Sequence, residues 1–172
     1  RRACQLADYI TVNISSPNTP GLRNLQFGDE FNSLLDELKE EQARLQAQHN
    51  IYTPIAVKLA PDMTQEQIVS CCESLLSRQF DGVIATNTTI DKSVLTSSPF
   101  AEEAGGLSGA PLSEKSCEVL QCIKAEVGER MPIIGVGGIM SADHAQQRLT
   151  AGADLLQIYT GFIYQGPALI EQ

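Results

Sequence analysis

Tryptophan is absent from this 172-residue chain, and aromatic residues make up only 5% of it. Basic residues are also scarce, because 12 Lys and Arg stand against 21 Asp and Glu and leave a formal net charge of -9. Nucleic-acid binding needs a surplus of basic side chains that neutralise phosphates, so this balance excludes a nucleic-acid partner. No apolar run is longer than a β-strand, and the sequence therefore predicts no membrane span.

Patterns typical of metal sites and disulfides are missing as well. The five cysteines are odd in number and contain no CxxC pair, which favours reduced thiols packed as small apolar side chains. The two histidines, His49 and His144, lie at the ends of predicted helices without a third partner. We therefore predict no metal site and no histidine-based catalytic triad.

Five apolar runs of strand length recur along the chain, at residues 9–14, 55–59, 82–86, 133–136 and 155–159. They are rich in Ile, Val and Leu with little alternation, which is typical of parallel strands buried on both faces. Amphipathic helical patterns separate them. Their ends are marked by a capping box at Thr64 and Gln67, a C-cap at Gly128 and an N-cap at Ser141. We expect a last helix to begin near Pro167.

This alternation of strands and helices fits either an open doubly wound sheet or a (β/α)8 barrel. Polar side chains or glycines follow every predicted strand. An open sheet gathers its chemistry at one switch point, whereas a barrel gathers it from the carboxyl end of every strand. We therefore predict an α/β fold of the TIM-barrel type. Five strands do not close a barrel, so we expect residues 1–172 to be the C-terminal five β/α units of a single domain, with about three strands before Arg1.

The densest cluster of polar residues lies at the end of the first predicted strand, where Asn13, Ser16 and Asn18 occur together with two prolines. An Asn side chain offers both a donor and an acceptor, so a pair of them is suited to a flat, amide-rich heterocycle. A serine between them is placed to contact a carbon of that ring. The loop is thus predicted to bind and attack a small polar ring.

Lys58 ends the second strand, where an unpaired buried cation would be costly. Three roles remain open for it: a Schiff-base nucleophile, a fixed cation beside an anionic cofactor ring, or a structural ion pair. Asn87 and Thr88 add hydrogen-bonding groups after the third strand, although an Asx turn would explain them equally well.

Glycines follow the last two strands, at Gly137–Gly138 and around Tyr159–Thr160. In barrels the common phosphate site is built from these two loops and a helix N-terminus, so we expect either a phosphate cradle or tight turns. The spacing does not match a dinucleotide fingerprint. Gly105–Gly109 ends a long polar segment, residues 91–104, which is expected to be a lid, a binding element or a flexible loop.

Several of these segments, in their order and spacing, resemble the quinone-dependent class 2 dihydroorotate dehydrogenases. They are Asn13–Arg23, Ala56–Lys58, Ala85–Thr89, Gly105–Gly109 and Ile134–Ile139. The resemblance covers essentially the whole chain without a departure. It implies an FMN-binding barrel, a flavoprotein oxidoreductase that oxidises (S)-dihydroorotate to orotate in pyrimidine biosynthesis and passes electrons to a quinone, either ubiquinone or menaquinone. It also implies peripheral contact with the cytoplasmic face of a membrane through a segment upstream of Arg1, and we expect a bacterial source.

Carried over by position, the resemblance makes Ser16 the catalytic base that removes the C5 proton of the substrate while the C6 hydride passes to flavin N5. Serine rather than cysteine at this position points to class 2. The substrate-binding residues would be Asn13, Asn18, Asn87 and Thr88. The FMN-binding residues would be Lys58, Thr86, Gly109, Gly138, Tyr159 and Thr160.

Two rival hypotheses remain at this point. The first is that the chain is another TIM-barrel enzyme, one that binds FMN or a phosphate ligand, such as an aldolase that uses Lys58. The second is that the chain is an inactive fragment that serves as an interaction module. The second rival follows from the expected absence of the first strands, where the family keeps further flavin and orotate contacts.

Overall fold

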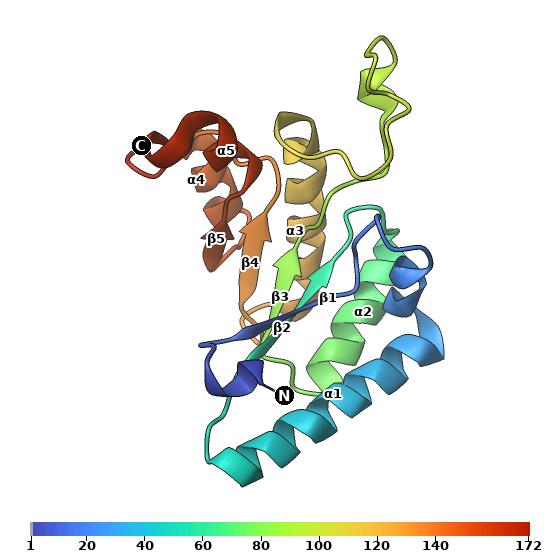
Figure 1. The fold of residues 1–172 in the computed structure, drawn as a ribbon, viewed down its shortest axis with the longest axis vertical. Coiled ribbons are helices and arrows are strands. Elements are labelled where there is room, and N and C mark those ends of the chain that lie inside the picture. The colour runs from blue at the N-terminus through green and yellow to red at the C-terminus, as the bar shows by residue number, and fades with distance from the viewer. Residues whose placement is uncertain (1) are drawn as a thin grey trace.

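The computed structural model describes residues 2–172 and contains a five-stranded parallel sheet (Figure 1). Its strands are β1 (Ile10–Asn13), β2 (Ile55–Leu59), β3 (Gly82–Ala85), β4 (Ile133–Val136) and β5 (Leu155–Gln157). They lie side by side in chain order, and every neighbouring pair is parallel. A doubly wound sheet reverses its strand order at a switch point, so this unbroken order is that of a barrel wall.

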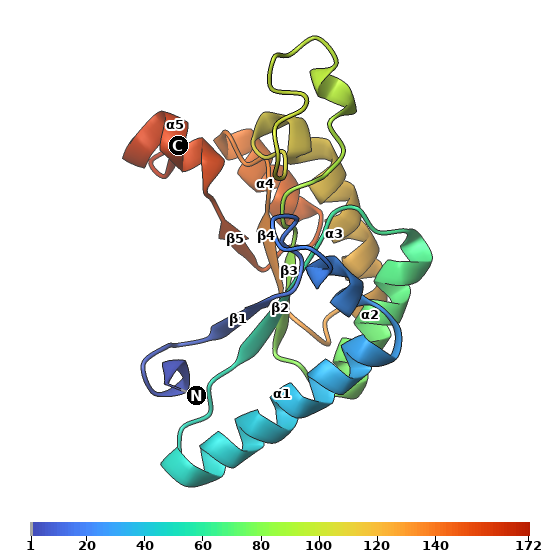
Figure 2. The same cartoon turned by 45° about the vertical axis from the view of Figure 1, so that its right-hand side comes forward.

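Helices follow the strands along the chain. They are α1 (Gly28–His49), α2 (Gln65–Ser77), α3 (Ser113–Val127), α4 (Ala142–Thr150) and α5 (Thr160–Gln165), and α1, α2 and α3 lie on the same side of the strands (Figure 2). Side chains alternate along a strand, so Val57 and Leu59 point to the helices and join the main core. Ala56, Ile84 and Val136 form a separate apolar cluster on the other face, which Lys58 continues toward the carboxyl end of β2.

The local signals at the helix ends are confirmed. Thr64 and Gln67 form the predicted capping box at the start of α2, and Ser141 Oγ accepts the His144 N–H at 3.3 Å at the start of α4. Gly128 ends α3 with a φ of 58°. Each of these contacts joins residues three or four positions apart, so the sequence alone is enough to predict it.

Two predictions near the C-terminus are wrong. The last strand ends at Gln157, because Tyr159 leaves the extended conformation and α5 begins at Thr160. The helix expected near Pro167 is a short 3₁₀ turn, Gly166–Leu169, entered through Gly166 at a φ of 64°. The positive φ of that glycine interrupts the helix and starts a new turn.

The cysteines of the described chain are free thiols, and Cys71 and Cys72 of α2 are buried in the main core. Burial raises the pKa of each of these two thiols to about 12, so neither is a reactive thiolate at neutral pH. In residues 2–172, no helix combines the length and apolar character that crossing a membrane requires. No group of three or more His, Cys, Asp or Glu in that range is arranged to hold a metal ion.

Candidate active site

A pocket of about 270 Å³ opens at the carboxyl ends of β2 to β5. Parallel strands end at the same edge of a sheet, and this brings together loops that are far apart in the sequence. Eight of the eleven residues to which the resemblance assigns a role line the pocket. They are Lys58, Thr86, Asn87, Thr88, Gly109, Gly138, Tyr159 and Thr160. The other three lie outside the pocket lining: Asn13 ends β1, and Ser16 and Asn18 lie on the loop that follows it.

Lys58 forms one wall of this pocket. It lies in register with Asn13 on β1 and Ile84 on β3, and its side chain is half-buried. None of the ion pairs in the described chain involves its ammonium group. Burial lowers the pKa of Lys58, since desolvation disfavours the charged form. The structural ion pair considered above is therefore not formed, whereas a cation for an anionic ring and an amine nucleophile both remain compatible with this geometry.

The opposite wall of the pocket is built from glycines that leave no room for a side chain. A Cβ on Gly138 would lie 2.3 Å from Ser113 Cα, and one on Gly109 would lie 3.0 Å from Thr160 Cγ2. Both glycines have positive φ, 70° and 77°, so they bring bare backbone to the pocket surface. Thr160 Oγ1 donates a hydrogen bond to Ser108 Oγ at 3.0 Å, and Ser108 lines the same pocket. No pattern in the sequence marks Ser108 as a pocket residue.

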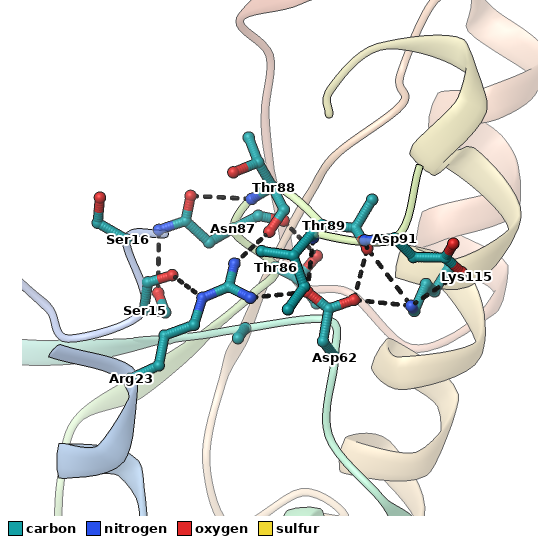
Figure 3. Close-up of polar contacts among 12 residues, drawn as sticks. Ser15, Ser16, Arg23, Asp62, Thr86, Asn87, Thr88, Thr89, Asp91 and Lys115 are labelled. Carbon is teal, nitrogen blue, oxygen red and sulfur yellow. Dashed lines mark hydrogen bonds and ion pairs between the residues drawn. The ribbon is translucent and has the colours of Figure 1, made fainter. Parts of the chain in front are cut away.

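The loop after β1 is tied to the end of β3 through a buried serine. Asn87 Nδ2 donates to Asn13 Oδ1 and to Ser15 Oγ, both at 3.0 Å. Ser15 is fully buried and also donates to Asn13 Oδ1 at 3.2 Å. Ser16 points away from this cluster (Figure 3), is partly exposed, and accepts the Asn18 N–H at 3.3 Å. The neighbouring serines thus differ in role, because Ser15 holds the loop in place while the Ser16 hydroxyl faces outward.

An ion cluster absent from the sequence predictions lies behind this loop and joins four segments (Figure 3). Arg23 donates to Ser15 O at 3.0 Å, to Thr88 O at 2.7 Å and to Asp62 Oδ2 at 2.8 Å. Asp62 also accepts hydrogen bonds from Lys115 at 2.7 Å and from the Ile90 N–H at 2.9 Å. The cluster therefore connects the loops after β1, β2 and β3 to helix α3.

Residues 91–104 project from the sheet as a long excursion (Figure 1). Its base is closed by an antiparallel bridge between Thr89 and Leu107. The backbone nitrogen of each residue donates to the carbonyl oxygen of the other, at 3.1 Å from Thr89 N and 2.7 Å from Leu107 N. Gly105 and Gly106 follow residues 91–104 directly. A Cβ on Gly106 would lie 2.9 Å from Pro17 Cγ, and one on Gly105 would lie 3.2 Å from Asn18 Oδ1. The glycine pair thus packs directly on the loop that carries Ser16.

The family model described as dihydroorotate dehydrogenase matches residues 1–172. A relative from Vibrio cholerae serotype O1, named dihydroorotate dehydrogenase (quinone), is 56% identical over 164 residues, which are 95% of this chain and 49% of the relative. A relative of the same name from Marinobacter nauticus is 57% identical over 166 residues, 96% of this chain and 49% of the relative. The chain spans about half the length of the curated relatives it matches.

Solved structures show the same relation. The crystal structure of DHODH from Eimeria tenella in complex with ferulenol has a TM-score of 0.90 and 33% identity, covering 99% of this chain and 49% of that chain. A ligand-free form of the Eimeria tenella protein gives a TM-score of 0.88 with 35% identity, covering 96% of this chain and 49% of that chain. These similarities confirm the predicted α/β fold and agree with a partial barrel.

Proposed function

This chain belongs to the dihydroorotate dehydrogenase family, and from that premise we propose that the protein oxidises (S)-dihydroorotate to orotate with FMN as cofactor and a quinone as electron acceptor. The observation that carries the proposal is the pocket at the strand ends, which has an unpaired half-buried Lys58 on one side and bare glycine backbone on the other. The name dihydroorotate dehydrogenase (quinone), shared by the relatives, supports the choice of substrate and acceptor.

The residues of the pocket fit FMN by their chemistry. Lys58 supplies a positive charge without an acidic partner, which suits an electron-accepting ring that becomes anionic on reduction. The backbone at Gly109 and Gly138 is open to close approach by a phosphate group. Thr86, Tyr159 and Thr160 complete the residues proposed to hold the cofactor. Bound FMN supplies the hydride acceptor for the reaction.

The substrate is proposed to bind over the loop after β1, held by Asn13, Asn18, Asn87 and Thr88. Asn13 and Asn87 are hydrogen-bonded to each other, which orients both amides before a ligand arrives and lowers the entropic cost of binding. Ser16 takes the C5 proton of dihydroorotate. Because a hydroxyl is a weak base, we propose that it passes the proton on to solvent by way of Thr19 or a water molecule.

Two measurements test this function. The visible spectrum of the purified full chain is expected to show flavin bands. In Ser16→Ala, stopped-flow reduction of the flavin by dihydroorotate is expected to slow by about 10²–10⁴-fold, with the flavin content unchanged. Ser70→Ala, on the exposed face of α2, is the matched control and should reduce at the unchanged rate. Normal reduction in Ser16→Ala would remove that serine from the mechanism.

The aldolase rival is tested separately at Lys58. Its lowered pKa also suits a Schiff-base nucleophile, which cyanoborohydride would trap as a stable adduct in the presence of a carbonyl substrate. We expect no adduct on Lys58. The shared name of the relatives also supports a proposed peripheral association with the membrane that holds the quinone.

A further inference from the structure

Helix α4 carries a buried arginine that the proposed site does not yet use. Arg148 is 1% exposed and has the largest side chain among the fully buried residues. No acidic side chain forms an ion pair with it in the described part of the chain, and its Nε has no hydrogen-bond partner. An arginine stays charged in a protein interior, and burying a charge without a counter-ion is costly. A negative charge near the guanidinium would therefore stabilise it.

The contacts of Arg148 lead to the pocket wall. The guanidinium donates to Gly137 O at 3.1 Å, to Ser116 Oγ at 2.9 Å and to Ser113 Oγ at 3.1 Å, and it also contacts Ser113 O. Gly137 and Gly138 line the pocket, whereas Arg148 and Ser116 do not. The guanidinium thus lies directly behind the glycine pair, one peptide unit away from the space a ligand would fill.

The orientation of that peptide unit follows from the same hydrogen bonds. The Gly137 carbonyl accepts from Arg148 and, at 2.8 Å, from Ser116 Oγ. The bond between Gly137 and Gly138 is trans, so the N–H on its other edge points the opposite way, toward the pocket. In residues 2–172 the Gly138 N–H has no acceptor. A donor without a partner, backed by a buried cation, is an arrangement that an anion completes.

We propose that Arg148 is a specificity-determining positioning residue that makes this pocket prefer a phosphorylated flavin to the unphosphorylated one. It acts through the Gly137–Gly138 peptide, by holding the N–H toward the ligand and by adding a positive potential behind it. The missing counter-ion of the guanidinium is the phosphate of the ligand. This inference rests on the proposed function, because it takes the flavin as the ligand of the pocket.

The test compares the binding of FMN and riboflavin, which differ only in the phosphate group. Flavin-free full chain is titrated with each ligand by fluorescence quenching. In Arg148→Gln, which removes the charge but keeps an N–H donor, the FMN affinity is expected to fall about tenfold, as for the loss of one charge-assisted interaction. The riboflavin affinity should stay within about twofold. Arg148→Lys, which keeps the charge, should restore the preference for FMN.

Arg44→Gln is the matched control, because it makes the same change of charge at an exposed arginine of α1 that does not line the pocket. It should leave the ratio of the two affinities unchanged. If Arg148→Gln does not fold, as judged by circular dichroism, Arg148→Met provides the neutral variant for the same ratio.

The possible outcomes separate the two proposals. An equal loss of FMN and riboflavin binding in the neutral variant would mean that Arg148 has only a structural role, and this would overturn the inference alone. If the unchanged chain bound neither flavin, the proposed function would fail and the inference with it. A collapse of the ratio that lysine reverses would support both.

Discussion

Replacing Asp62 by asparagine removes one charge from the ion cluster while keeping the shape of the side chain. The Asp62 carboxylate accepts hydrogen bonds from Arg23, Thr89, Lys115 and the Ile90 N–H, at 2.5 to 2.9 Å. An amide presents N–H groups to at least one of these donors, so donor faces donor. Arg23 and Lys115 are both left without their short-range negative partner.

The exposure of the three charged side chains sets the expected magnitude. The side-chain exposures of Asp62, Arg23 and Lys115 are 13%, 17% and 34%. Removing one partner of a fully buried pair costs about 3–5 kcal/mol, and an exposed pair contributes about 0–1 kcal/mol. The cluster lies between these limits, so we expect Asp62→Asn to lower the free energy of unfolding by about 2–3 kcal/mol. For a chain of this size that corresponds to a melting temperature lower by about 4–12 °C.

The pH dependence gives a second, independent signature. Burial by itself raises the pKa of Asp62, but the hydrogen bonds from Lys115, Thr89, Ile90 and Arg23 outweigh it and lower the pKa below its ordinary value. A carboxyl group whose folded pKa is lowered stabilises the protein above its unfolded pKa, and this contribution is lost as the pH falls through the folded value. The stability gap between the two proteins should therefore persist at neutral pH and close below about pH 3.9.

The assay is thermal and urea unfolding of the full chain, followed by circular dichroism at several pH values. Asp91→Asn is the matched control, because Asp91 is exposed and lies 3.8 Å from the same Lys115 ammonium. We expect no change in its melting temperature. Equal melting temperatures for Asp62→Asn and Asp91→Asn would refute the reasoning that the buried ion cluster stabilises the packing of the three loops.

Two further predictions concern the pocket walls. Lys58→Met should raise the stability of the flavin-free chain by about 1 kcal/mol at neutral pH while weakening flavin binding. Burial lowers the pKa of Lys58 in the folded chain, so between that lowered value and about pH 10.4 the unfolded chain binds more protons than the folded chain, and the stability of the unchanged protein rises with pH. The stability advantage of Lys58→Met should therefore shrink as the pH rises through that range, which urea titrations at pH 7 and pH 10 measure. A variant less stable than the unchanged protein at pH 7 would contradict this prediction. Gly138→Ala puts a Cβ 2.3 Å from Ser113 Cα at a φ of 70°, so it should destabilise the chain by about 1–3 kcal/mol and lower the flavin content of the purified protein. Gly128→Ala, also at positive φ but with open space around the new Cβ, separates the backbone strain from the clash, and equal effects of the two changes would show that the close packing does not matter.

The sequence was informative about the site wherever a residue follows a strand. Lys58, Asn87 and Gly138 lie at or just after the ends of predicted strands, and parallel strands bring such positions to one edge. Their placement around one pocket agrees with that reasoning, while their roles toward FMN and dihydroorotate remain proposals. Ser108 and Ser15 were missed because a serine in a polar loop has no pattern that separates a structural hydroxyl from an exposed one.

Many of the local elements of this protein were determined by its sequence alone. The capping box at Thr64, the N-cap at Ser141 and the strand Ile55–Leu59 were all predictable, because each depends on hydrogen bonds or side-chain periods within a few residues.

Only the tertiary structure decided which charges meet. Asp62 contacts Arg23 across 39 positions of sequence and Lys115 across 53, and Arg148 of α4 contacts Gly137 in the pocket wall. Contacts of this kind depend on the register of the strands and on how each helix packs, and neither leaves a pattern in the residues near one position. The sequence therefore specifies where the polar groups stand along the chain, and packing determines which of them are left without a partner at the pocket.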